Sequence, residues 1–186
     1  MDNRVYLDDN IWFIENFISH EDLDVLLSEC NDCDGWGGLG NWLDKVKEPK
    51  EQKTKDVINS LNIRIQNEIT NDIEMANAFN ALQRTFPSSN PNDVWSLEPH
   101  TDTHEYSDSQ YVTKGYILYF NDTFSGGELE YVNKNLSIKP KPGMLVCHPG
   151  SEEYKHGVRA VTDGVRFYSS SFVYDKKYMM DIRTKQ

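Results

Sequence analysis

Two patterns of hydrophobic and polar residues divide the chain near residue 80. In residues 54–78, apolar side chains recur every three or four positions, at Val57, Ile58, Leu61, Ile65 and Ile69. This spacing predicts a long amphipathic helix with one buried face and one polar face. After residue 80 the apolar positions occur in short runs, with Gly, Pro, Asn and Asp between them. Such runs predict strands joined by turns.

The segment before the long helix predicts one or two strands in residues 5–17 and a shorter helix after them. Ile11, Phe13 and Phe17 mark the buried positions of the strands. Ser19 is a good N-cap, because its hydroxyl can accept a hydrogen bond from a free N–H of the first helical turn. The acidic residues at positions 21 and 22 suit the positive end of the helix.

The second half of the chain predicts further strands over residues 82–86, 112–120, 126–132, 136–139, 144–148, 154–160 and 165–174. Short strands at this spacing are typical of a β-sandwich or barrel, of which the jelly roll is one form. With the helices before them, they predict an α+β fold: a double-stranded β-helix (jelly-roll) core with supporting N-terminal helices. We expect one domain over residues 1–186, with helical support in about 1–80 and the jelly roll in about 81–175.

Composition and charge narrow the classes of partner. The chain has 38% apolar and 12% aromatic residues, which is enough for a core. Its net charge of -11 repels phosphate backbones, so we expect no nucleic-acid partner. No apolar run reaches the roughly eighteen residues of a membrane span, and residues 1–4 lack the basic start of a signal peptide. We therefore expect a cytoplasmic protein with no membrane partner; its oligomeric state is not indicated.

The three cysteines do not form a metal-binding framework. Cys30 and Cys33 have zinc-like spacing, but a closed structural zinc site needs four ligands, and no second pair follows. Cys147 lies in a predicted apolar strand, which favours a packing role.

The residues that indicate chemistry are His100 and Asp102, together with a histidine about fifty residues later. If their segment is extended, both side chains lie on one face, because side chains alternate along a strand. Two imidazoles and one carboxylate form the facial triad of non-heme Fe(II) oxygenases, which leaves positions for a co-substrate and oxygen. His156 and His148 are both candidates for the third ligand. His104 competes with His100, because it also stands two residues from Asp102.

Four blocks of sequence occur in a fixed order around these residues. They are Leu82-Gln83-Arg84-Thr85-Phe86-Pro87, His100-Thr101-Asp102, Tyr119-Phe120-Asn121-Asp122 with Gly126-Gly127-Glu128-Leu129, and His156 with Arg166. His-x-Asp alone is a weak signal, but the ordered set is specific. Through it, residues 82–174 resemble the catalytic core of the iron(II)- and 2-oxoglutarate-dependent dioxygenases, in the prolyl 4-hydroxylase-like branch.

The resemblance implies that His100, Asp102 and His156 bind Fe(II), because the family order favours them over His104 and His148. The implied reaction is hydroxylation of a C–H bond, of a peptidyl proline or a similar side chain, with release of succinate and CO2. Relatives that halogenate lack the carboxylate ligand, and Asp102 is present here.

The resemblance also implies that Arg166 and Tyr119 hold the distal carboxylate of 2-oxoglutarate. A guanidinium suits this task because it makes two parallel charge-assisted hydrogen bonds to a carboxylate. Phe172 matches a bulky residue near the metal pocket, and Phe86 lacks the tyrosine hydroxyl that many relatives place near the co-substrate. The implied cofactors are Fe(II), 2-oxoglutarate as co-substrate and ascorbate as a candidate reductant. The implied partners are O2 and a protein, peptide or small-molecule substrate.

One loop tests whether His156 and Arg166 can face the same site. If residues 162–164 form a three-residue hairpin loop with Gly164 left-handed, Arg166 pairs with Ala160. His156 and Arg166 then share a face about four residues, or roughly 13 Å, apart. A two-residue loop would put them on opposite faces, so we predict an odd-length loop.

Two other classes of function remain open. A cupin-like enzyme would use the same metal ligands without 2-oxoglutarate, and it would not depend on Arg166. A jelly-roll binding or structural protein would have no iron chemistry at all. Within the dioxygenase hypothesis, a free amino acid or another small molecule is the alternative to a peptide substrate, because fold does not fix substrate.

Overall fold

The fold consists of two sheets that face each other and a helical layer outside one of them. The computed structural model describes residues 3–38, 44–103 and 108–178. His104, the alternative to His100 as a ligand, lies outside the described residues. Within them, no helix has the length and apolar character that crossing a membrane requires.

In the residues that the structure describes, the first half of the chain contains both α-helices and the strands up to β7, which carries His100. They are β1 (Val5–Tyr6), β2 (Trp12–Ile14), α1 (His20–Asn31), β3 (Trp36–Gly37), β4 (Val46–Lys47), α2 (Gln52–Ile69), β5 (Glu74–Ala76), β6 (Leu82–Thr85) and β7 (Trp95–His100). The second half, as far as the structure describes it, consists of strands joined by loops and two short 3-10 helices, which are labelled η. It contains η2 (Asp108–Tyr111), β8 (Val112–Tyr119), β9 (Phe124–Gly126), β10 (Leu129–Tyr131), β11 (Leu136–Ile138), β12 (Leu145–Pro149), η3 (Glu152–Tyr154), β13 (His156–Arg159), β14 (Val161–Gly164) and β15 (Arg166–Asp175).

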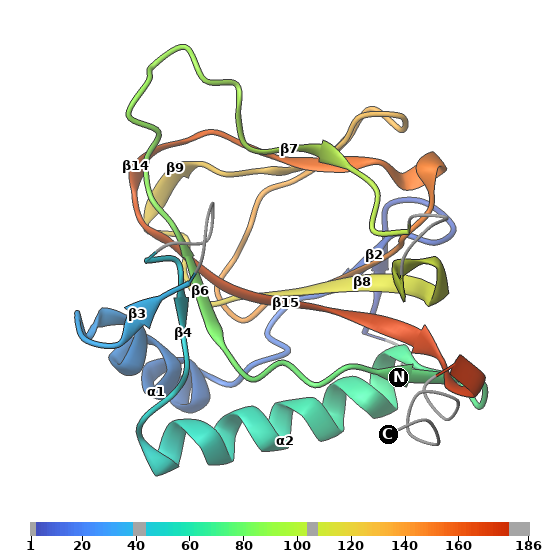
Figure 1. Ribbon diagram of the computed structural model, residues 1–186, viewed down its shortest axis with the longest axis horizontal. Coiled ribbons are helices and arrows are strands. Elements are labelled where there is room, and N and C mark those ends of the chain that lie inside the picture. Colours follow the sequence, from blue (N-terminus) through green and yellow to red (C-terminus); the bar gives the residue numbers. More distant parts are fainter. Residues whose placement is uncertain (1–2, 39–43, 104–107, 179–186) are drawn as a thin grey trace.

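The strands of the described residues form a large and a small antiparallel sheet. The large sheet has the order β1-β2-β12-β8-β15-β6-β4-β3, and β5 also pairs with β15. The small sheet has the order β11-β10-β13-β7, and β14 pairs with β9 as a separate two-stranded ribbon. Figure 1 shows the small sheet lying over the large one. This confirms the predicted jelly roll.

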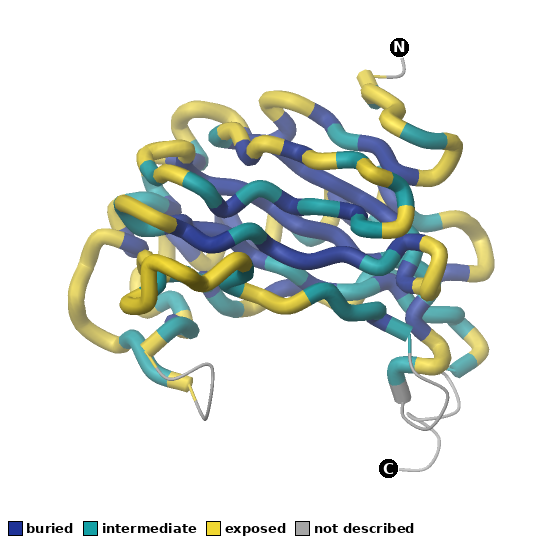
Figure 2. Tube along the Cα trace, turned by 90° about the horizontal axis from the view of Figure 1, so that it is seen from above, coloured by how far each residue is buried: buried dark blue, intermediate teal, exposed yellow. Residues whose placement is uncertain are grey.

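Two apolar cores hold the three layers together. One lies between the sheets and includes Ile117, Leu129 and Val158. The other lies between the large sheet and the helices, where Leu118 of β8 packs with Leu61 of α2. Figure 1 shows α2 running along the outer side of the large sheet, and Figure 2 shows buried strand centres with exposed loops at both ends. The helices therefore close one face of the large sheet and leave its other face to the interior.

The two helices begin and end for different local reasons. Ser19 caps α1 as predicted, since its hydroxyl accepts from the Asp22 N–H at 3.1 Å. The prediction that the long helix reaches residue 78 is wrong, because α2 ends at Ile69 and residues 74–76 form β5. The Thr70 hydroxyl donates back to the Gln66 carbonyl. The apolar spacing continues at Ile73, four residues after Ile69, but this side chain is 67% exposed. It therefore has no packing in the core that would support another helical turn.

The predicted hairpin between β13 and β15 is wrong. These two strands lie in different sheets, and residues 161–164 between them form β14, which pairs with β9. Gly164 is left-handed as expected, with φ +72°. However, Arg166 lies opposite Thr85 of β6, not opposite Ala160. The chain crosses from the small sheet to the large one here, so His156 and Arg166 reach one interior from two facing sheets.

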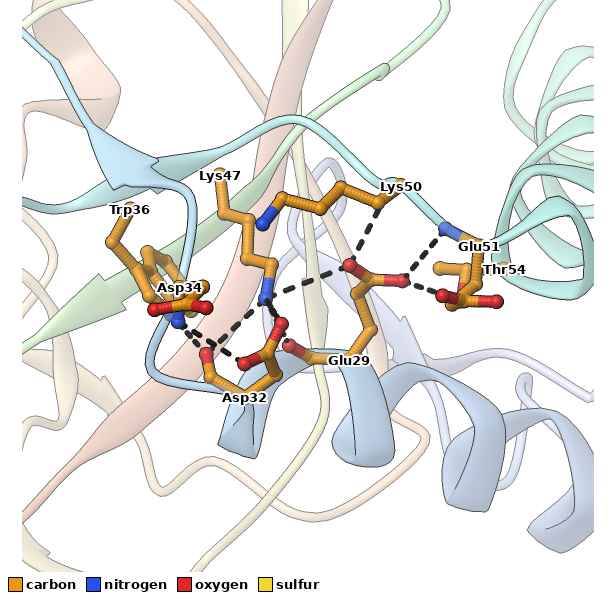
Figure 3. A network of polar contacts seen from close by, with 8 residues as sticks. All are labelled: Glu29, Asp32, Asp34, Trp36, Lys47, Lys50, Glu51 and Thr54. Carbon is orange, nitrogen blue, oxygen red and sulfur yellow. Dashed lines mark hydrogen bonds and ion pairs between the residues drawn. The ribbon is translucent and has the colours of Figure 1, made fainter.

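A buried lysine ties the end of α1 to the segment that precedes α2. The side chain of Lys47 is 0% exposed, and its Nζ donates to the Glu29 carbonyl at 2.8 Å and to the Asp32 carbonyl at 3.2 Å. It also contacts both carboxylates, with Asp32 Oδ2 at 3.0 Å and Glu29 Oε1 at 3.5 Å. Figure 3 shows this network. A cation at this position satisfies carbonyls that a helix C-terminus leaves free.

Glu29 extends the same network to the start of α2. Its carboxylate accepts from the N–H groups of Lys50 and Glu51 and from the Thr54 hydroxyl. Burial alone would raise the pKa of Glu29, but these hydrogen bonds and the Lys47 charge together lower it. The pair is therefore a fixed structural element, because both charges are paired and hydrogen-bonded.

We expect Lys47→Met to destabilise the protein by about 3 kcal/mol, because it leaves the buried Glu29 carboxylate without its cation. Urea unfolding followed by circular dichroism measures the loss. Lys53→Met, at an exposed position of α2, is the matched control and should change stability by less than about 0.5 kcal/mol. Equal stabilities for the two variants would show that the Lys47 pairing contributes nothing net.

Candidate active site

A cavity of about 630 Å³ opens between the two sheets. His100, Asp102 and His156 lie on its wall together with Arg166. Its volume falls within the range of about 300–1,000 Å³ that is usual for small-molecule sites. The structure thus brings four of the five predicted site residues to one cavity wall. The fifth, Tyr119, is buried outside the lining, with its ring centroid 5.0 Å from the guanidinium carbon of Arg166.

Strand pairing in the small sheet brings the two histidines together. His156 of β13 lies opposite His100 of β7, and their ring centroids are 4.7 Å apart. The register shifts next to this pair, since Val158 lies opposite Leu97 rather than residue 98. Pro99 has no N–H to give to the ladder, and such bulges re-aim side chains beside active sites. The extra residue lets both Leu97 and His100 line the cavity.

Asp102 completes a set of three possible ligands. One atom from each of His100, Asp102 and His156 can be chosen so that all lie within 4.8 Å of one another. Asp102 Oδ1 is 3.7 Å from Nε2 of each histidine. Two imidazole nitrogens and one carboxylate oxygen are a donor set that suits Fe(II). The residues present therefore fit the metal that the resemblance implies.

The backbone around the two histidines fixes which nitrogen faces the carboxylate. His100 Nδ1 is 2.9 Å from the Glu98 carbonyl, and His156 Nδ1 is 3.0 Å from the Tyr154 carbonyl. A carbonyl only accepts, so each Nδ1 carries the proton and each Nε2 keeps a lone pair for a metal. Burial lowers the pKa of His156 to about 4, with a further contribution from His100. His156 is therefore neutral near pH 7, as a ligand must be.

Two glycines make room for Asp102. Its N–H donates to the Gly150 carbonyl at 3.1 Å, which fixes the segment after β7 against the end of β12. On the other side lies Gly115 of β8. A Cβ added there would stand 2.5 Å from Asp102 Oδ2 and 2.9 Å from Cε1 of His148. A side chain at position 115 would therefore displace the carboxylate.

His148, the predicted alternative to His156, lies beside the three residues without joining them. It is 2% exposed and lines the cavity from β12. Its ring is 4.2 Å from that of His156, centroid to centroid. Burial, aided by His156, lowers the pKa of His148 well below its usual value, so the ring is neutral.

Arg166 is a buried cation whose charge the described part of the chain does not pair. It is 1% exposed, and the described residues supply no carboxylate within ion-pair distance and no acceptor for its Nε. Its guanidinium carbon lies 4.1 Å from the Tyr168 ring centroid and 5.0 Å from that of Tyr119. Aromatic faces offset only part of the cost of burying a charge. An anionic ligand in the cavity fits this site.

The buried side chain of Tyr119 also indicates that an anionic ligand fits beside Arg166. Its buried hydroxyl has no hydrogen-bond partner among the described residues. Burial raises the pKa of Tyr119, and the nearby Arg166 charge offsets part of that rise. A neutral phenol beside a guanidinium can donate to a carboxylate.

The sequence did not single out Tyr168 and Thr85, which also line the cavity beside Arg166. Tyr168 stands two residues after Arg166, so strand alternation would have found it. Thr85 is opposite Arg166 across β6 and β15, a pairing between residues 81 apart that no local signal reveals. Phe172 does line the cavity, whereas Phe86 is 41% exposed and stacks on Arg84. Thr85 thus provides a hydroxyl on the wall that Phe86 lacks.

Residues 92–174 match the model of the 2OG-Fe(II) oxygenase superfamily. Among curated proteins, the chain is 35% identical over 80 residues to prolyl 3-hydroxylase 2 of Homo sapiens. The match covers 40% of this chain and 10% of that protein, so the chain spans about a tenth of its length. The matched model includes all the predicted metal ligands and Arg166.

Solved structures show the same fold. A viral collagen prolyl hydroxylase from Paramecium Bursaria Chlorella virus-1 superposes with a TM-score of 0.64 at 16% identity, covering 94% of this chain and 98% of that one. A prolyl hydroxylase from Trichoplax adhaerens, in complex with a hypoxia inducible factor peptide fragment, gives 0.61 at 15%, covering 92% and 86%. At these identities the likeness supports the fold alone, and it confirms the α+β jelly roll.

We expect Gly115→Ala to weaken metal binding roughly tenfold, because its new Cβ displaces the Asp102 carboxylate and the His148 ring. Titration with Co(II), followed in the visible spectrum, measures the dissociation constant. Gly37→Ala is the matched control, since a Cβ added at Gly37 meets no atom within 4 Å. Unchanged affinity in Gly115→Ala would mean that the Asp102 position does not control metal binding.

Proposed function

We propose that this chain, whose residues 92–174 match the model of the 2OG-Fe(II) oxygenase superfamily, hydroxylates a C–H bond with Fe(II) and 2-oxoglutarate. One observation carries the proposal: an unpaired buried guanidinium, Arg166, lines the same cavity as His100, Asp102 and His156. A metal site alone would suit many reactions. The cation deep in the same interior is what calls for a carboxylate-bearing co-substrate, which a cupin-like enzyme does not need.

In this proposal the small sheet holds the metal and the large sheet holds the far end of the co-substrate. His100, Asp102 and His156 would hold iron, because their ligand atoms lie close together on the cavity wall. Arg166 would bind the distal carboxylate of 2-oxoglutarate, with the Tyr119 hydroxyl as a second donor. When bound, iron and 2-oxoglutarate supply the oxidising chemistry, which consumes O2 and releases succinate and CO2. The chain's own part is to orient the reactants and exclude water.

We further propose that the substrate is a peptidyl proline or a similar side chain. The curated relative and both solved structures are named as prolyl hydroxylases, and one of them holds a peptide fragment. The rim of the cavity suits such a substrate, because Leu97 is exposed on it and Phe172 provides an aromatic wall. A cytoplasmic location and ascorbate as reductant belong to the same proposal.

Arg166→Leu should raise the dissociation constant of 2-oxoglutarate about a hundredfold, because two charge-assisted hydrogen bonds are lost. The dissociation constant for Arg166→Lys should lie between those of the wild type and Arg166→Leu, since an ammonium keeps the charge but cannot make two parallel hydrogen bonds. Anaerobic titration of the Fe(II) protein, followed by its metal-to-ligand charge-transfer band, measures the binding. Arg159→Leu is the control and should leave the dissociation constant unchanged. The Arg159 guanidinium donates to Glu130 and stacks on Trp95, and it does not line the cavity.

Succinate release by the same variants separates the two enzyme classes. It should fall in parallel with 2-oxoglutarate affinity if the co-substrate binds at Arg166. Full activity of Arg166→Leu on a metal-dependent reaction, with no effect of 2-oxoglutarate, would instead indicate a cupin-like enzyme.

Proline-containing peptides should gain the mass of one oxygen atom in the presence of Fe(II), 2-oxoglutarate and O2. Mass spectrometry detects the product, and amino-acid analysis distinguishes 3- from 4-hydroxyproline. Peptides with each proline replaced by alanine are the control. Succinate release that no proline peptide stimulates, but a free amino acid does, would exclude the peptide substrate and keep the reaction class.

A further inference from the structure

His148 is a buried polar side chain that the proposed chemistry does not use. It projects from β12 into the interior, opposite Gly115 of β8. Its ring stands edge-on to His156 and also to Tyr131, at centroid distances of 4.2 Å and 5.4 Å. An apolar ring of similar size would fill this space without a buried polar cost. A specific interaction of the imidazole nitrogens must therefore offset the cost of burying them.

The two oxygens of Asp102 face different neighbours. Oδ1 is 3.7 Å from Nε2 of both His100 and His156, so it points to the metal position. Oδ2 points the other way, with His148 Nδ1 at 3.9 Å. The absent side chain at Gly115 gives this outer oxygen its room. The carboxylate is thus set between the two histidines of the candidate metal site and a third histidine behind it.

The proton on His148 can be placed from its surroundings. Nδ1 faces two acceptors, the Pro149 carbonyl at 3.2 Å and Asp102 Oδ2. Neither can donate, so Nδ1 carries a proton in either charge state of the ring. Its N–H consequently faces the outer oxygen of the carboxylate, at a donor–acceptor distance of 3.9 Å.

We propose that His148 is a positioning residue that holds Oδ2 of Asp102, so that the carboxylate meets the metal through Oδ1 alone. The inference rests on the proposed metal site and adds a supporting residue to it. Partners behind ligating carboxylates orient the ligand and affect metal affinity as strongly as tenfold to a hundredfold. By this role His148 also keeps the cavity side of the metal open, because a carboxylate that turned to bind through both oxygens would occupy another position.

Three substitutions at His148 test the role of the Nδ1 proton. Asparagine places an amide N–H the same number of bonds from Cβ as Nδ1, whereas glutamine places it as far away as Nε2. Phenylalanine keeps the ring and removes both nitrogens. We expect His148→Phe and His148→Gln to weaken Co(II) binding about tenfold, and His148→Asn to stay close to wild type. Thermal unfolding of each metal-free protein checks that the fold is retained.

The visible spectrum of bound Co(II) gives a second measurement that simple packing would not affect. Its band should change in His148→Phe and His148→Gln, because coordination geometry sets it, and stay unchanged in His148→Asn. Equal affinity and spectra in all variants would overturn the positioning role. So would an equal loss in His148→Asn and His148→Phe, which would indicate packing or direct ligation.

The contrast between the two amides decides the question even if His148→Phe does not fold. Failure of wild-type protein to bind Co(II) would have a different meaning, because it would remove the metal site itself and the proposed function with it. Wild-type binding that does not depend on residue 148 would remove only the positioning role.

Discussion

The burial of Arg166 without a protein carboxylate is the constraint on which the site depends. Removing a guanidinium from water costs several kcal/mol even after relaxation. Stacking on Tyr168 and Tyr119 returns about 0.5–2 kcal/mol for each desolvated contact, which does not close the gap. The described residues leave the counter-charge to be supplied by a ligand. The cavity is therefore preorganised for an anion. The buried Tyr119 hydroxyl, which has no hydrogen-bond partner among the described residues, can donate to the same anion.

The sequence predicted correctly those features that depend on a few neighbouring residues. Ser19 capped its helix, and the short apolar runs became strands. His100 and Asp102 came together as expected, although Asp102 lies just after the end of β7 and not on the strand itself. The sequence prediction failed where the answer depends on distant pairing. The geometry assumed for Arg166 treated β13 and β15 as one hairpin, but two loops of similar composition can reverse a strand or carry it to the other sheet.

The same limit explains two spatial relations that the sequence did not reveal. Thr85 joins the cavity because β6 pairs with β15, and His148 approaches Asp102 because β8 carries a glycine between them. Neither relation has a local signature. Gly115 itself looked like an ordinary strand residue in the sequence, and only the packing around it reveals that a Cβ would meet two side chains. The extent of the single domain and the roles of the site residues stay predictions.

In the proposed function, the position of the candidate metal ligands and of Arg166 on opposite sheets also favours one class of co-substrate. The small sheet fixes one end of the cavity through His100 and His156, and the large sheet fixes the other through Arg166. Both sheets are braced by packed cores, so this separation cannot adjust to a shorter molecule. A keto acid with a single carboxylate would chelate the metal and leave Arg166 buried and unpaired. Sites built to pair a buried polar group reject analogues that lack its partner far more strongly than they reject a missing methylene. Discrimination in favour of a diacid therefore follows from the cost of the buried charge, and it requires no further contact along the chain of the co-substrate.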